Sequence, residues 1–213
     1  MPDFDDDEYE SFDLDGPVDG APAADSEAEF DEPDLDEPDL DEPDDEDDEL
    51  EDAAPDEIDF VIAAYREDGQ PLVQALQSPL ANDLEELIVQ LRRLPGDAGA
   101  LGFVSLVEEV FVIVRVRGQH VQVLLNDSGA ANEWPIARDV ADLLNEEIPD
   151  PDEEETEPMG DLGILSDLGI SDFDMETIID NLDQTSDQML AEIADKIKIG
   201  LQFRKIADAA FPA

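Results

Sequence analysis

Cysteine is absent from the 213-residue sequence, and histidine occurs once, at His120. Without cysteine the chain forms no disulfide, offers no thiol nucleophile and holds no cysteine-ligated zinc or iron–sulfur cluster. One histidine is too few for a multi-histidine metal site or for most histidine-based catalytic sites. The sequence also has neither a G-x-S-x-G turn nor a Walker loop. We therefore expect no metal, no cofactor and no enzymatic activity.

Basic residues are also scarce, with ten Lys and Arg against 62 Asp and Glu and a formal net charge of −52. Phosphates and anionic lipids repel such a chain, so we expect no direct binding to nucleic acid and none to membranes. No apolar run approaches the roughly 18 residues of a membrane span, and the first five residues lack the features of a signal peptide. Together with the absence of cysteine, these features predict a cytoplasmic protein.

The acidic residues are concentrated in residues 1–57, which hold 30 of the 62 and contain no Lys or Arg. This segment has eight Leu, Ile, Val or Phe residues, too few to offset an ordering entropy of about 1–2 kcal/mol per residue. The pentad Asp-Glu-Pro-Asp-Leu recurs over residues 31–44, and its prolines block helix propagation. We interpret residues 1–57 as a disordered acidic tail. The alternative is an arm that mimics nucleic acid and contacts a basic partner surface.

Residues 58–148 have the pattern of an α+β domain with an antiparallel sheet. One helix is predicted after Asn82, interpreted as its N-cap, and a second opens at Trp134 and Pro135. The order β-β-α-β-β-β-α is also that of profilin-like and longin-type adaptor domains, an analogy of topology alone. Alternating apolar residues predict strands over 60–65, 71–76, 100–107, 110–117 and 121–126.

The remainder of the chain is predicted to be helical. Residues 149–160 read as an acidic linker, and residues 161–213 read as a small helical module. Ser171 is interpreted as a helix cap. Since the helices are short, they must pack on one another or on the sheet. They are expected over 162–168, 173–182, 188–199 and 201–210.

Four residues are candidate partner contacts: Arg115, Arg117, Trp134 and Arg138. Arg115 and Arg117 share one face of the strand over 110–117, which changes from apolar to cationic along its length. This face is either a solvated strand end with packed arginine stems or a docking surface for an acidic group. Trp134 either closes the core beneath the loop over 127–133 or is a contact residue. We expect Trp134 and Arg138 near the same edge as the two arginines.

Several stretches carry a family resemblance: AAYREDG at 63–69, LRRLPG at 91–96, GALGFVS at 99–105, VRVRG at 114–118 and AANEWPIARD at 130–139, with shorter matches at 160–162 and 189–190. On these stretches, residues 58–213 resemble the tRNA adenosine deaminase-associated proteins of actinobacteria. The resemblance implies a link to the deaminase through gene neighbourhood, and it supplies no catalytic residues. The acidic repeat over 31–44 lies outside it.

Two hypotheses for function follow. The chain is not the deaminase itself, because a zinc deaminase needs His and Cys ligands in an H-x-E…P-C-x-x-C arrangement and this chain has no cysteine. The first hypothesis is a non-enzymatic accessory or adaptor protein that modulates or scaffolds the deaminase in tRNA wobble-base modification. The alternative is a small-ligand sensor or an α+β enzyme that uses Arg115, Arg117 and carboxylates. A deep pocket with converging Arg and Asp side chains would favour the alternative.

Overall fold

The computed structural model describes residues 50–96, 99–152 and 157–210. Most of the predicted acidic tail, including the repeat over 31–44, lies outside the described residues, as does part of the predicted linker. None of the helices within these described ranges is long and apolar enough to cross a membrane.

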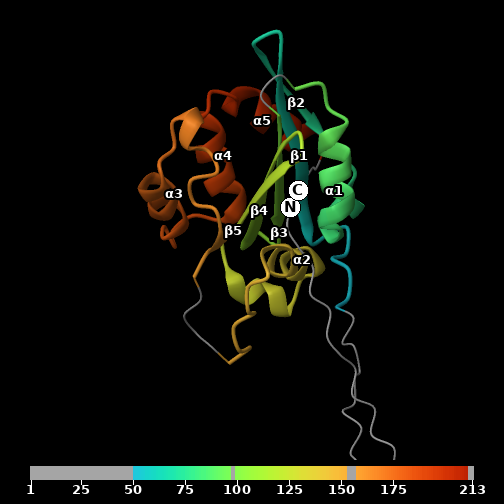
Figure 1. Cartoon of the computed structure of the whole chain (residues 1–213), viewed down its shortest axis with the longest axis vertical. Coiled ribbons are helices and arrows are strands. Elements are labelled where there is room, and N and C mark those ends of the chain that lie inside the picture. Colours follow the sequence, from blue (N-terminus) through green and yellow to red (C-terminus); the bar gives the residue numbers. More distant parts are fainter. Residues whose placement is uncertain (1–49, 97–98, 153–156, 211–213) are drawn as a thin grey trace, which may run out of the picture. The chain divides into compact units, whose positions relative to one another are not determined.

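Six antiparallel strands form one sheet in the order β2-β1-β3-β4-β5-β6 (Figure 1), which confirms the predicted α+β class. Five of the strands follow the predicted hydrophobic runs. The sixth lies inside the segment predicted as an acidic linker, where two residues pair with Leu124 and Leu125 of β5. A two-residue strand is too short to produce an alternating pattern, so the sequence gives no sign of it. The strands are β1 (Ile58–Glu67), β2 (Gln70–Ala75), β3 (Ala100–Leu106), β4 (Val110–Arg117), β5 (His120–Leu125) and β6 (Met159–Gly160).

Strands β3 and β4 are buried on both faces, apart from Arg117 at the end of β4. Alternate residues point to opposite faces, so each strand contributes to two separate hydrophobic clusters. We call the two faces the valine face, with Val104, Val112 and Val114, and the phenylalanine face, with Phe103 and Phe111. Both faces therefore need a covering layer.

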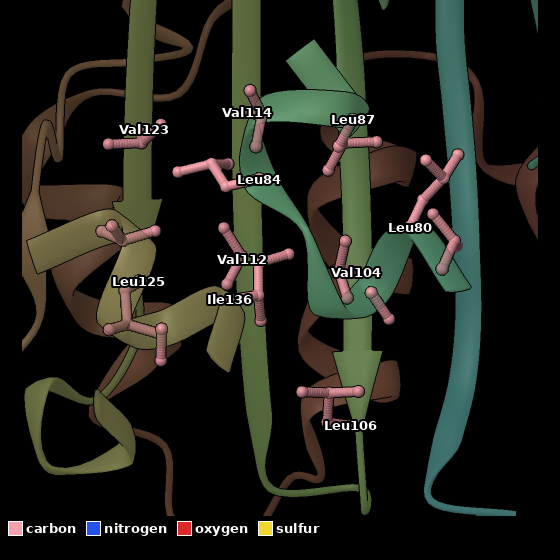
Figure 2. Close-up of a cluster of buried hydrophobic side chains, with 14 of the residues drawn as sticks. Leu80, Leu84, Leu87, Val104, Leu106, Val112, Val114, Val123, Leu125 and Ile136 are labelled. Carbon is pink, nitrogen blue, oxygen red and sulfur yellow. The ribbon is translucent and has the colours of Figure 1, made fainter. Parts of the chain in front are cut away.

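The valine face is covered by α1 (Leu84–Arg92) and α2 (Pro135–Leu144). Figure 2 shows Leu84 and Leu87 of α1 and Ile136 of α2 over the valines of the sheet. The predicted N-cap of α1 was wrong by one residue, because Asp83 accepts the Glu86 N–H at 2.7 Å. Short 3-10 turns, η1 (Ser78–Asn82) and η2 (Ser128–Asn132), precede the two helices.

The phenylalanine face is covered by α3 (Asp172–Ile179), α4 (Ser186–Lys196) and α5 (Gly200–Ala210). Figure 1 shows α3 and α4 on the opposite side of the sheet from α1. Phe203 of α5 packs edge-on against Phe60 and Phe103, with ring centroids 5.3 and 5.4 Å apart. The predicted cap is confirmed, because Ser171 and Asp174 form a capping box at the start of α3. The helix expected over 162–168 is instead a turn followed by a 3-10 turn, η3 (Ser166–Leu168).

Residues 50–57 link the N-terminal segment to β1, and part of this link is packed. Ala53 is buried in the valine-face core. Its N–H donates to Asn82 Oδ1 at 2.9 Å, and its carbonyl accepts from Asn82 Nδ2 at 3.2 Å. Asn82, predicted as a helix cap, instead fastens the segment before β1 to η1.

Two truncations separate the acidic segment from this packed link. Deleting residues 1–49 is expected to leave the thermal midpoint nearly unchanged, since the composition of that segment cannot support a core. Deleting residues 1–56 also removes Ala53 and its two hydrogen bonds, worth roughly 1 kcal/mol each. The midpoint should then fall by about 4–8 °C. Circular dichroism melts at moderate salt measure both, and an equal loss for the shorter truncation would contradict the expectation.

Candidate functional site

Arg115, the first of the candidate contact residues, lies in the interior of the protein. Its side chain extends from β4 on the phenylalanine face and is 3% exposed. Nη1 donates to the Ile164 carbonyl oxygen at 2.7 Å, and the guanidinium forms two hydrogen bonds to the Asp167 carboxylate at 2.5 and 2.7 Å. These hydrogen bonds hold the pKa of Asp167 below its ordinary value. Arg115 therefore fastens the turn before α3 to the sheet and offers no charge at the surface.

Arg117, two residues further along β4, is exposed. Its Nη2 donates to Gln122 Oε1 at 2.7 Å, and Gln122 Nε2 donates to Asp161 Oδ2 at 2.5 Å. The chain of polar side chains crosses from β4 over β5 to the residue that follows β6. Arg117 thus lies exposed at the end of β4 with its guanidinium hydrogen-bonded to Gln122, and its role as a partner contact stays a prediction.

Trp134 and Arg138 do not lie beside the two arginines. Both flank or belong to α2, on the valine face, whereas Arg115 points into the layer on the other face. Trp134 is half-buried and packs against the valine-face core, and Arg138 Nε donates to the Ala131 carbonyl oxygen at 3.4 Å. The expectation of a shared edge was wrong, because the sequence does not specify which face of the sheet each helix covers.

A narrow crevice lies beside Arg115, between the ends of β1, β3 and β4 and the segment that joins α4 to α5. Its lining is mostly apolar and includes Tyr65, Arg66, Leu168 and Ile199. The cavity volume of about 40 Å³ has room for a few water molecules, whereas pockets for small ligands are of the order of 300–1,000 Å³. Arg115 is already neutralised by Asp167 here. The crevice therefore lacks the size and the converging groups that the ligand-sensor alternative requires.

A network of hydroxyl and carboxylate groups has a structural role, because it links strands of the sheet to α4. Ser105 Oγ of β3 donates to Asp59 Oδ2 at 2.8 Å and lies 2.7 Å from Ser186 Oγ at the start of α4. Asp59 also accepts the Glu108 N–H at 2.8 Å. Ser105 and Ser186 are almost completely buried, so substrate cannot reach these hydroxyls. The network joins β1, β3 and α4. Within the described ranges, no group of three or more His, Asp or Glu side chains is placed to hold a metal ion.

A groove between α1 and α2 on the valine face is much larger than the crevice beside Arg115, with a volume of about 650 Å³. We call it the α1–α2 groove. Apolar side chains from both helices and from β5 line it, and carboxylates stand along it. Its lining comprises Asn82, Asp83, Leu84, Glu85, Ile88, Val89, Arg92, Val121, Asp139, Asp142 and Leu143. The spacing of these residues on each helix was visible in the sequence, but the approach of the two helices was not.

Asp139 of α2 connects the two helices that form the groove. Its Oδ2 accepts the Leu84 N–H at 3.0 Å, at the N-terminus of α1. Burial raises the pKa of Asp139 above its ordinary value, and the neighbouring carboxylates of Asp83, Asp142 and Glu85 act in the same direction. The hydrogen bond from Leu84 opposes them. The charged form of Asp139 is therefore disfavoured in this groove.

The architecture is thus an α+β sheet with a helical layer on each face. A family model described as "Rv3753c-like tRNA adenosine deaminase-associated protein" matches residues 59–200, and the chain belongs to this family. Protein Rv3753c of Mycobacterium tuberculosis is 32% identical over 151 residues, which cover 70% of this chain and 87% of that protein. No solved structure matches this chain. The sequence resemblance is confirmed, and the residues before 59 lie outside the family match.

The Arg115–Asp167 pair predicts a pH-dependent stability. The lowered pKa of Asp167 contributes stability above the ordinary carboxyl pKa of about 3.9, and this contribution is lost as the pH falls through the lowered pKa. Asp167→Asn should therefore be less stable than the wild type at pH 7, by about 1 kcal/mol because solvent screens the half-exposed carboxylate. Urea unfolding at pH 7 and pH 3 measures the difference, which should shrink at pH 3. Asp150→Asn, in an exposed loop, is the control and should show no such trend.

Asp139 affects the pH dependence of stability in the opposite direction to Asp167. Since its pKa is raised, folding weakens as the pH rises from the ordinary carboxyl pKa through the raised one. Asp139→Asn keeps an acceptor for the Leu84 N–H without the disfavoured charge, so it should be at least as stable as the wild type at pH 7. Asp139→Ala loses the acceptor and should be less stable by about 0.5–2 kcal/mol, as for other helix caps. If urea titrations find Asp139→Asn as unstable as Asp139→Ala, the charge itself is required.

Proposed function

We propose that the protein is a non-enzymatic accessory protein that binds a tRNA adenosine deaminase and modulates or scaffolds its action on the tRNA wobble base. The family match carries this proposal, because it spans residues 59–200 of the folded chain and the family description names the deaminase as the associated protein. The similarity to Protein Rv3753c, over 151 residues that cover 87% of that protein, supports the proposal.

Three observations support a non-catalytic role. The sequence has no cysteine to ligate zinc as the deaminases do. The pair of buried Arg115 and half-exposed Asp167, together with the Ser105–Ser186 network, holds the helical layer to the sheet. The crevice beside Arg115 has a volume of about 40 Å³, too small for a nucleobase substrate.

The positions of the candidate contact residues in the structure change the roles that we propose for them. Arg117 is exposed at the end of β4 and remains a proposed contact with the deaminase. Arg115 acts indirectly, by positioning the turn before α3. The acidic segment is proposed to contact a basic partner surface, on the basis of its sequence composition.

Co-purification tests the proposal. Tagged full-length protein and the tRNA adenosine deaminase of the same organism, mixed at about 0.15 M salt with and without tRNA, should elute as a complex. The protein alone should not deaminate adenosine in tRNA. Arg117→Gln should slow association and reduce its salt dependence, as is typical of charges at an interface rim. Lys205→Gln, an equal charge change on the exposed side of α5, is the control. Absence of any complex under both conditions would refute the proposal.

A further inference from the structure

We propose that the α1–α2 groove is a docking site for a short cationic, amphipathic segment of a partner protein. Apolar side chains of that segment would cover the floor of the groove, and its Lys or Arg side chains would meet the carboxylates along the walls. The chemistry of the groove carries this inference by itself, and the identification of the partner with the deaminase rests on the proposed function.

The floor is apolar because the two helices leave part of the valine face uncovered. Helix α1 lies over β3 and β4, while α2 packs toward the end of β5 that pairs with β6. Val121, at the opposite end of β5, is half-buried between them, and Val89 of α1 is half-buried on the same wall. Leu143 of α2 is 49% exposed. A partner that covers these side chains removes apolar surface from water, which favours binding.

The walls carry four carboxylates and one arginine, Arg92, so their net charge is negative. Asp83 and Glu85 belong to the start of α1, and Asp139 and Asp142 belong to α2. None of the four carboxylates forms an ion pair with another residue of the described chain. Arg92 contributes a guanidinium at the far end of α1. The groove therefore has an anionic end and a cationic end, which orients a charged occupant.

The pKa of Asp139 is raised mainly by burial, and the neighbouring groove carboxylates add to that effect. Burial and the carboxylates of Asp83, Asp142 and Glu85 all disfavour its charged form. An ammonium or guanidinium group in the groove would reverse that effect, because an opposite charge within about 4–6 Å favours the charged carboxylate. The site thus gains electrostatic energy from a cationic occupant and loses it with an anionic one.

The dimensions favour a segment of a protein. The lining residues of α1 extend from Leu84 to Arg92, about 12 Å at 1.5 Å per residue, which is about two turns of a helix. A groove that combines an apolar floor with charged walls is the usual setting for an amphipathic helix with anchors at i, i+3 and i+4. Nucleic acid and anionic lipid are excluded as occupants, because the four carboxylates would repel their phosphates.

The test uses isotope-labelled full-length protein and a 14-residue amphipathic helical peptide made of Leu and Lys, at about 0.15 M salt. NMR shift changes are expected in α1, α2 and around Val121. The acidic N-terminal segment also attracts the peptide, so matched variants isolate the groove. Glu85→Gln/Asp142→Asn should weaken binding at these residues about fivefold, whereas Glu176→Gln/Asp180→Asn, the same charge change at the C-terminal end of α3, should not. Equal weakening by both pairs would overturn the proposal.

Apolar contact is tested by a second pair of variants. Leu143→Ser removes the exposed leucine of the groove and should weaken peptide binding severalfold. Leu201→Ser, a substitution of an 84% exposed leucine on α5, should leave it unchanged. If shift changes in the groove instead grow with protein concentration in the absence of peptide, a second copy of the chain occupies the groove and the proposal is wrong.

Binding measurements with the deaminase distinguish failure of this inference from failure of the proposed function. If the deaminase binds the wild type and Glu85→Gln/Asp142→Asn equally well, the groove is not its docking site and the inference fails for this partner, while the proposed function stands. If the deaminase does not bind but the Leu–Lys peptide binds in the groove, the proposed function fails and the groove remains a site for cationic segments.

Discussion

The burial of β3 and β4 on both faces is the constraint on which the rest of the structure depends. A sheet whose central strands are apolar on both sides is unstable in water until each face has a covering layer. Helices α1 and α2 supply one layer, and the C-terminal helices supply the other. The C-terminal helices are each too short to be stable alone, so they depend on the sheet as much as the sheet depends on them.

The alternation of side chains along β4 assigns each residue a structural role. Val112 and Val114 fill one core, and Phe111 and Ile113 fill the other. Arg115 follows in the phenylalanine-face register, under the C-terminal layer, where a buried guanidinium needs a partner. Asp167 and the Ile164 carbonyl supply one, and they thereby fix the turn that leads into α3. The buried guanidinium of Arg115 therefore joins the sheet to the C-terminal helical layer.

The sequence therefore predicts elements and faces better than it predicts their assembly. The strands, the Pro135 start of α2 and the Ser171 cap follow from local patterns, and all occur in the structure. The burial of Arg115 and the position of Trp134 on the other face depend on which helix covers which side, and no local pattern encodes that. The α1–α2 groove was missed for the same reason, since its two walls are about 55 residues apart in the chain.

The ion pairs of the described residues are unevenly distributed between the two helical layers. The ion pairs of Arg115, Lys196 and Arg204 all lie in the layer on the phenylalanine face, where they fasten helices or the turn before them. The carboxylates of the α1–α2 groove have no such partner among the described residues, although the chain carries ten Lys and Arg. The valine-face layer has arginines of its own, including Arg92 at one end of the groove, yet the four groove carboxylates form no ion pair within the described chain and stand beside an apolar floor. A cationic partner segment would satisfy both features at once, which the described chain does not do by itself.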